Sequence, residues 1–180
     1  MKKGKYIFLL FALILTLSAC NKEKTEPAQE NKPSEHENMN HTGPNEAPEN
    51  IQAAANPAFP VGSTAIIQAD HMPGMNGEKA TIVAAYDTTA YEVSYTSSTG
   101  EVVKNHKWII HEELRNPQPA PIQPGIEVTL NAEHMEGMQG AKAVIDSAEQ
   151  TTVYMVDYTS STGEKVTKHK WVTESELSKE

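Results

Sequence analysis

From residue 59 onward, hydrophobic and polar residues alternate in short runs that are typical of half-buried β-strands. The pattern Tyr-x-Val-x-Tyr occurs at residues 91–95 and again at 154–158, and apolar residues alternate with polar ones at 126–130. Ser-Thr-Gly sequences after the tyrosine runs supply turn residues. Further strands are expected at residues 80–86, 143–149, 103–109 and 166–172, with closing helical turns at 112–114 and 174–177.

The same pattern occurs twice along the chain, at a spacing of 63 residues. Residues 59–115 align without a gap with residues 122–178, and 28 of the 57 pairs are identical, which indicates a tandem duplication. Residues 116–121 alternate prolines with other residues and should form an extended, semi-rigid linker. We therefore predict an all-β fold with two tandem small SH3-like barrel or curled-sheet domains, repeat 1 at 59–115 and repeat 2 at 122–180.

The N-terminus reads as a targeting segment. Three lysines precede an apolar run of about twelve residues, which is too short for a comfortable transmembrane helix. The run ends in Leu-Ser-Ala-Cys, which resembles the lipobox of bacterial lipoproteins, in which the cysteine is acylated. We predict a lipoprotein signal peptide at residues 1–19 and a lipid on Cys20, which places the protein at the outer face of the cytoplasmic membrane. The alternative is an ordinary signal peptide with an incidental cysteine.

The segment after the lipobox is polar. Residues 20–58 contain no aromatic residue and one aliphatic β-branched residue, Ile51. They therefore cannot bury enough apolar surface to fold alone. We predict a lipid-anchored disordered stalk. His36, Met39 and His41 lie within six residues of it and are candidate metal ligands, with chance composition as the alternative.

Charge and cysteine content narrow the function classes. The chain has 24 acidic and 15 basic residues, which gives a formal net charge of −9. Without the three leader lysines it has 12 basic and 24 acidic residues, a formal net charge of −12. Binding of nucleic acid draws on clustered lysine and arginine, which the chain lacks, whereas an acidic protein suits cations. A single cysteine cannot form an internal disulfide.

Each repeat carries a His-Met-x-Gly-Met sequence between its first two expected strands. Imidazole nitrogen and thioether sulfur are the ligands that select copper, with sulfur favouring Cu(I) and imidazole also accepting Cu(II). Methionine in a glycine-containing loop has little core to fill, although core packing remains the alternative. The candidate copper ligands of the two loops are His71, Met72, Met75, His134, Met135 and Met138.

A second pair of histidines belongs to the repeated His-Lys-Trp sequence. His106 and His169 each come two residues before a tryptophan, which places both side chains on one face of a regular strand. Each could complete a loop site, or could instead bond to the backbone of a small sheet. Asp70 and Glu133 precede the loop histidines and are candidates for orienting them. His111 has no counterpart in repeat 2 and is expected to be a surface residue.

The lipobox and the duplicated His-Met-x-Gly-Met, Tyr-Thr-Ser-Ser-Thr-Gly-Glu and His-Lys-Trp motifs together resemble the YdhK-type bacterial lipoproteins, a two-copy family long labelled as of unknown function. Its better-understood relatives include the copper-resistance surface lipoprotein CopL, which binds copper outside the cell and limits copper toxicity. The resemblance implies copper binding through the histidines and methionines of the two loops.

Enzyme function is not expected, because the chain has no nucleophile elbow, phosphate-binding glycine loop or His-Glu-x-x-His helix. Zinc would accept histidine and aspartate but would gain nothing from paired methionines. We expect a membrane-anchored protein that sequesters or buffers copper, with a copper exporter or oxidase as a candidate partner. The alternative is a module that binds cell wall or peptide through exposed tyrosine, tryptophan and acidic groups, without any metal.

Overall fold

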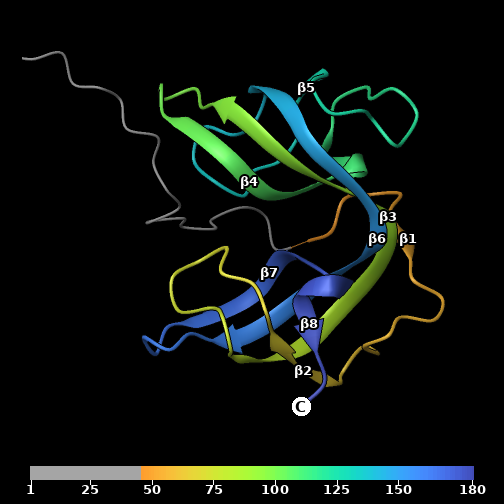
Figure 1. The fold of residues 1–180 in the computed structure, drawn as a ribbon, viewed down its shortest axis with the longest axis vertical. Coiled ribbons are helices and arrows are strands. Elements are labelled where there is room, and N and C mark those ends of the chain that lie inside the picture. Colours follow the sequence, from red (N-terminus) through yellow and green to blue (C-terminus); the bar gives the residue numbers. More distant parts are fainter. Residues whose placement is uncertain (1–45) are drawn as a thin grey trace, which may run out of the picture. The chain divides into compact units, whose positions relative to one another are not determined.

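The computed structural model describes residues 46–180, and its regular elements are strands and two short 3-10 helices (Figure 1). In chain order they are β1 (Gln52–Ala53), β2 (Thr64–Ile67), β3 (Lys79–Thr96), β4 (Val102–Ile110), η1 (His111–Glu113), β5 (Glu127–Thr129), β6 (Lys142–Thr159), β7 (Lys165–Thr173), η2 (Glu174–Glu176) and β8 (Leu177–Ser178). The predicted all-β class is confirmed, and η1 and η2 are the predicted closing turns. Cys20, His36, Met39 and His41 lie outside the described residues, within which no helix has the length and apolarity to span a membrane.

Strands β3 and β6 are much longer than predicted and pair with each other antiparallel along nearly their whole length. In repeat 1 the two strands expected at 80–86 and 91–95 are one continuous strand. The joining residues 87–90 contain two threonines and neither glycine nor proline, so they favour extended backbone over a turn. Thr88 pairs with Thr151, its own counterpart 63 residues later, so the two repeats are related by a local two-fold axis at this pair.

The long strands carry each repeat from one hydrophobic core into another. We call the residues around the first core lobe 1 (59–86 and 153–178) and those around the second core lobe 2 (90–114 and 122–149). Figure 1 shows β2, β7 and β8 at one end of the β3–β6 pair and β4 and β5 at the other. Each lobe is a curled antiparallel sheet made from the first half of one repeat and the second half of the other.

This exchange corrects the expectation that each repeat folds as a separate domain. The chain crosses the boundary between the lobes twice, once along β3 and once along β6. The described residues all belong to one unit of the chain. The proline-containing segment 116–121 connects two parts of lobe 2, because Leu114 bridges to Leu130 and Ile122 lies in the core of that lobe. The segment therefore does not separate the lobes.

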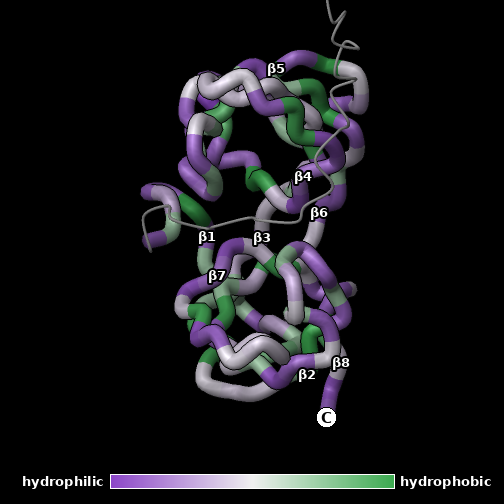
Figure 2. The backbone as a smooth tube through the Cα atoms, turned by 90° about the vertical axis from the view of Figure 1, so that its left-hand side faces the viewer, coloured by the Kyte–Doolittle hydropathy of each residue, from purple (hydrophilic) through white to green (hydrophobic). Residues whose placement is uncertain are grey.

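Part of the predicted stalk is folded. Ala47 and Ile51 pack against a third hydrophobic cluster between the lobes, which contains Trp108 and Trp171. Strand β1 pairs with β3 beside the strand crossing (Figure 2). The prediction of a disordered stalk is therefore wrong for residues 46–58, because a few apolar side chains find partners there that the local sequence does not reveal.

Candidate metal centre

In lobe 1 the His-Met loop of repeat 1 meets β7 of repeat 2. His71 and His169 have their ring centroids 6.3 Å apart, and both side chains are buried, with 7% and 2% of each residue exposed. Tyr158 packs edge-on against His169, and its hydroxyl donates to Met72 Sδ at 3.5 Å. Burial, and to a lesser degree Glu164, raises the pKa of Tyr158 to about 12, which keeps this hydroxyl protonated. Tyr158 thus contacts both His169 and Met72, and His71 lies next to His169.

A half-buried carboxylate completes this group. Glu176 Oε1 lies 2.9 Å from His71 Nε2, while Oε2 accepts hydrogen bonds from Trp108 Nε1 at 2.8 Å and from the Thr173 amide at 3.0 Å. Burial by itself would raise the pKa of Glu176, but the hydrogen bonds and electrostatic interaction with His71, together with the bonds from the Thr173 amide and Trp108, outweigh it and hold the pKa below its usual value. We call the set His71, Met72, Tyr158, His169 and Glu176 site 1.

Lobe 2 contains the same arrangement with the repeats exchanged. Site 2 consists of His134, Met135, Tyr95, His106 and Glu113. The ring centroids of His106 and His134 are 5.9 Å apart, the Tyr95 hydroxyl donates to Met135 Sδ at 3.5 Å, and His134 Nε2 lies 2.7 Å from Glu113 Oε1. Trp171 Nε1 donates to Glu113 Oε2 at 3.0 Å. In both sites one repeat supplies the histidine and methionine of the loop, and the other supplies the tyrosine, the second histidine and the carboxylate.

The predicted position of the tryptophans is wrong. The pairing of β4 with β3 slips by one residue on each side of His106, and Asn105 before it has a φ of 51°. Such bulges break the two-residue alternation of a regular strand. His106 therefore points into lobe 2, whereas Trp108 lies in the cluster between the lobes and bonds to Glu176 of site 1. The slips recur on both sides of His169 in β7.

The carboxylates beside the imidazoles are not those weighed from the sequence. Asp70 and Glu133 are exposed, and Glu113 and Glu176 from the closing turns take the place next to the histidines. The sequence contained a hint of Glu113 and Glu176, because the Glu-Leu pair recurs at the end of both repeats although most neighbouring positions differ. Asp70 and Glu133 were weighed because each directly precedes a loop histidine in sequence. Neighbouring side chains in an extended segment point apart, so neither carboxylate meets the imidazole beside it.

The two methionines of each loop have different surroundings. Met75 and Met138 are fully buried in the hydrophobic cores of lobes 1 and 2. Met72 and Met135 are only half-buried and receive the tyrosine hydroxyls. The alternative of core packing therefore fits the second methionine of each loop, and the first is the better placed to offer its sulfur to a ligand.

A glycine in each loop allows it to dock on a turn of the other repeat. Gly74 has a φ of 71°, and its carbonyl oxygen accepts a hydrogen bond from the Ser161 amide at 3.0 Å. A Cβ atom at Gly74 would lie 2.6 Å from Ser161 Oγ. Gly137 makes the same bond to the Ser98 amide at 2.9 Å. The turn serines therefore hold the His-Met loops against the sites.

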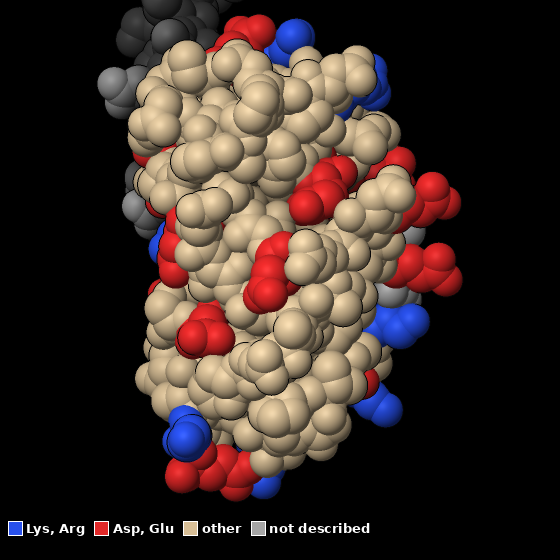
Figure 3. All heavy atoms as spheres, turned by 90° about the vertical axis from the view of Figure 1, so that its right-hand side faces the viewer, with Lys and Arg blue, Asp and Glu red and all other residues tan. Residues whose placement is uncertain are grey.

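Across residues 46–180, no three His, Cys, Asp or Glu side chains are placed so that they could hold a metal ion together. A metal in either site would therefore depend on methionine sulfur in addition to imidazole. Acidic side chains spread across the middle of the face shown in Figure 3, with lysine and arginine toward its edges, which suits the approach of cations.

Comparison with known proteins identifies the family. The family described as "Protein of unknown function (DUF1541)" matches residues 61–111 and 124–174, which is more than half of the chain. The chain belongs to the DUF1541 family. It is 52% identical over 186 residues to "Uncharacterized protein YdhK" of Bacillus subtilis (strain 168), covering 99% of this chain and 91% of that protein.

Solved structures of the same relative share this fold. A crystal structure described as a DUF1541 family protein (ydhK) from Bacillus subtilis has a TM-score of 0.76 at 56% identity, covering 79% of this chain and 98% of that one. A solution NMR structure of the ydhK C-terminal domain has a TM-score of 0.65 at 59% identity, covering 68% and 94%. The predicted membership of a YdhK-type family with two copies is confirmed.

The DUF1541 matches include both His-Met loops and both His-Lys-Trp sequences, but they end at residues 111 and 174, two residues before Glu113 and Glu176. Since each site takes residues from both copies, one DUF1541 repeat contains neither site complete.

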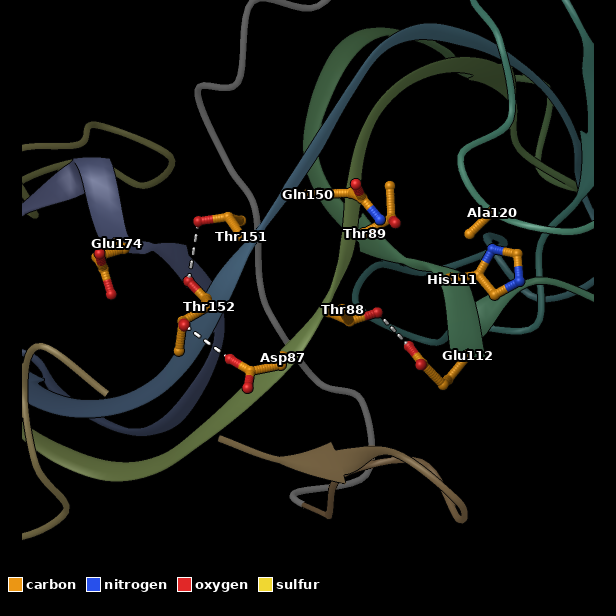
Figure 4. A pocket seen from close by; sticks show the side chains of 10 residues that line it. All are labelled: Asp87, Thr88, Thr89, His111, Glu112, Ala120, Gln150, Thr151, Thr152 and Glu174. Carbon is orange, nitrogen blue, oxygen red and sulfur yellow. Dashed lines mark hydrogen bonds between the residues drawn. The ribbon is translucent and has the colours of Figure 1, made fainter. Parts of the chain in front are cut away.

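A separate cavity of about 600 Å³ lies where β3 and β6 cross (Figure 4). Thr88 donates to Glu112 and Thr152 donates to Asp87 across it. His111 lines this cavity and is half-buried, with Nδ1 3.1 Å from the Tyr91 hydroxyl, so it is not a plain surface residue. Its lining contains no methionine, and its polar groups largely bond to one another.

Proposed function

We propose that the protein binds copper in sites 1 and 2 and thereby sequesters or buffers it. The observation that carries this proposal occurs twice in one chain: two buried histidines approach each other, and a tyrosine that packs against one of them bonds to a half-buried methionine. Two imidazoles that bind one ion at metal–nitrogen distances of about 2.0–2.1 Å have ring centroids roughly 5–6 Å apart. The separations of 6.3 Å in site 1 and 5.9 Å in site 2 are close to that requirement.

The chemistry of the ligands favours Cu(I). Thioether sulfur is a soft, neutral ligand that suits Cu(I), whereas imidazole accepts both Cu(I) and Cu(II). Zn²⁺ gains little from sulfur of this kind and favours closed sites of thiolate and imidazole. Because Met72 and Met135 are the more exposed ligands, an incoming ion would meet sulfur first.

The alternative of a wall-binding or peptide-binding module loses its main support. It relied on exposed tyrosine and tryptophan side chains, but Trp108 and Trp171 are 6% and 0% exposed. The tyrosines of both Tyr-x-Val-x-Tyr sequences are buried as well. These aromatic rings build the cores and the two sites, so little aromatic surface remains for a polymer to stack on.

The rest of the chain suits storage outside the cytoplasm. A lipid on Cys20 would hold the sites at the outer membrane face, because several acyl chains together give stable anchoring. His36, Met39 and His41 would add a weaker capture site ahead of the folded part. The partner of such a buffer would be a copper exporter, which supplies the ion, or a copper oxidase, which takes it up. No reaction is proposed for the protein itself.

Anaerobic titration of the chain with Cu(I) against a competing chelator tests the proposal. The double variant Met72→Leu with Met135→Leu should lose about two copper equivalents, one for each site. The control is Met75→Leu with Met138→Leu, which removes the same number of sulfur atoms from the cores and should keep both equivalents. Leucine for methionine usually costs less than about 1.5 kcal/mol of stability, so both variants should fold. Unchanged Cu(I) binding in the first variant, or Zn²⁺ binding as tight as Cu(I), would contradict the proposal.

A further inference from the structure

We propose that Glu176 and Glu113 are positioning residues that fix the hydrogen of each loop histidine on Nε2, so that Nδ1 of His71 and of His134 is the atom that binds copper. This inference rests on the proposed function and specifies the ligand atom and the residue that selects it. Each carboxylate acts through its histidine and would not touch the metal.

Site 1 carries the argument. His71 Nε2 lies 2.9 Å from Glu176 Oε1, and an ionised carboxylate can only accept hydrogen bonds. A neutral imidazole has one N–H donor and one lone pair, so the hydrogen on Nε2 leaves the lone pair on Nδ1. His71 Nδ1 is buried and has no hydrogen-bond partner among residues 46–180. A buried acceptor without a partner costs free energy. A metal ion that accepts the Nδ1 lone pair would remove this cost.

The carboxylate is held rigidly for this task. Trp108 Nε1 and the Thr173 amide both donate to Glu176 Oε2, which leaves Oε1 for His71. Trp108 comes from the other repeat, and the amide belongs to the backbone just before η2. Rotation of the carboxylate would break both of these bonds, so the fold fixes the position of Oε1. The hydrogen bond to Oε1 then orients the His71 ring.

Site 2 has the same connections. Glu113 Oε1 lies 2.7 Å from His134 Nε2, and Trp171 Nε1 and the Ile110 amide donate to Oε2 at 3.0 and 3.2 Å. Lys170 Nζ adds a positive charge 3.8 Å from Glu113 Oε1. The preservation of a histidine, a glutamate and a tryptophan in one bonding pattern, across two repeats that are about half identical, points to a shared task.

Carboxylates that accept the second N–H of a ligating histidine fix its tautomer and raise its basicity, and their loss commonly costs 10–100-fold in metal affinity. We therefore expect Glu176→Gln to weaken Cu(I) binding at site 1 by about 10–100-fold. Asp70→Asn is the matched control, because it removes an exposed carboxylate next to His71 in sequence that does not meet the imidazole. It should change the affinity by less than about twofold.

Nitrogen-15 NMR of the histidine side chains of the whole protein tests the inference directly, first without metal and then with Cu(I), which is diamagnetic. Without metal, His71 and His134 should show the hydrogen on Nε2 at pH 8. On Cu(I) addition their Nδ1 signals should shift while the Nε2–H signals persist. Glu176→Gln should mix the two tautomers of His71 in the metal-free protein, a change that a merely structural role would not produce.

The outcomes separate the inference from the proposed function. Cu(I) bound with the shift at Nε2, or a metal-free His71 with its hydrogen on Nδ1, would overturn the inference and leave copper binding intact. Failure of Cu(I) to bind sites 1 and 2 at all would overturn the proposed function and the ligand assignment with it. The wild-type spectra decide these points even if Glu176→Gln does not fold.

Discussion

At the residue scale, the two His-Met loops show that the same residue type has different roles at different positions of one motif. The methionine three residues after Met72 turns into the core of lobe 1, while Met72 itself meets the Tyr158 hydroxyl. Between them, Gly74 provides the left-handed backbone that lets the loop reach Ser161. The motif is therefore a core anchor, a docking glycine and a pair of candidate ligands in one short segment.

Replacement of Gly74 by alanine should destabilise the protein more than replacement of Gly77. Both glycines have positive φ, which costs a residue with a Cβ about 1–2 kcal/mol. At Gly74 the new methyl group would also crowd Ser161 Oγ and the Ser161 amide, whereas nothing lies within 4 Å of a Cβ at Gly77. Urea unfolding of the two variants measures the difference. Equal losses would mean that the contact between the loop and the serine turn adds nothing.

Stability should fall at acidic pH because of Glu113 and Glu176. The fold lowers the pKa of both carboxyls, so below the unfolded value of about 4.5 the unfolded chain takes up protons more readily than the folded one. The contribution is complete above that pH and is lost as the pH falls through the lower folded-state pKa. Glu113→Gln should flatten this part of the stability–pH curve, which thermal unfolding between pH 3 and 6 would measure. An unchanged curve would show that the carboxylate is not ionised in the fold.

At the scale of elements, the long strands and their bulged partners decide where the site residues lie. Strand β3 leaves lobe 1 without a turn, and β4 then returns along it with a slip on either side of His106. The slips send His106 into one lobe and Trp108 toward the other. As a result, a single strand contributes to both sites.

The link between Trp108 and Glu176 can be measured by a double-mutant cycle. The variants Trp108→Phe and Glu176→Gln should show a coupling energy of about 0.5–3 kcal/mol in unfolding, as expected for residues in contact. The same cycle with Trp171→Phe and Glu176→Gln should be additive within about 0.5 kcal/mol, because Trp171 bonds to Glu113 instead. Coupling of Glu176 to Trp171 rather than to Trp108 would show that the repeats are not exchanged.

At the scale of the whole molecule, the repeats are interlocked. The pairing of β3 with β6 continues through both lobes and across the crossing point at Thr88 and Thr151. Segment 116–121 is the only covalent connection between repeat 1 and repeat 2, and it lies exposed on lobe 2. The lobes are thus held together by strand pairing rather than by this linker.

Cleavage of the linker should therefore leave the molecule whole. A protease site inserted between Gln118 and Pro119 should be cut readily, since exposed segments are preferred sites of nicking. The two fragments should still elute together in size-exclusion chromatography and separate only in denaturant. Two independently folded repeats would instead separate on cleavage without denaturant.

The proposed lipid anchor also belongs to the scale of the whole chain. Because Cys20 is the only cysteine, Cys20→Ala should abolish lipidation and leave precursor or shed protein in place of a membrane-bound form. Fractionation of cells that express the variant, with wild type alongside, measures the change. Mature protein that still partitions with the membrane would contradict the lipobox interpretation.

The sequence by itself determined the local features of this protein. Period-two alternation specified strands, the spacing of 63 residues specified a duplication, and the His-Met loops and His-Lys-Trp sequences named the candidate ligands. These features depend on the residue types within a few positions of each other, because side-chain alternation and turn chemistry are local properties of the backbone.

Only the tertiary structure decided which copies combine. Two repeats with about half of their residues identical offer similar strand edges and core residues to each other, so the pattern alone cannot say whether a repeat closes on itself or on its partner. Continuation of β3 through residues 87–90 settled this choice, and it brought His71 to His169 and His134 to His106. The contacts of Glu176 and Glu113 with the histidines and tryptophans followed, because these residues lie 21 to 105 positions apart in sequence and their contacts depend on the path of the whole chain.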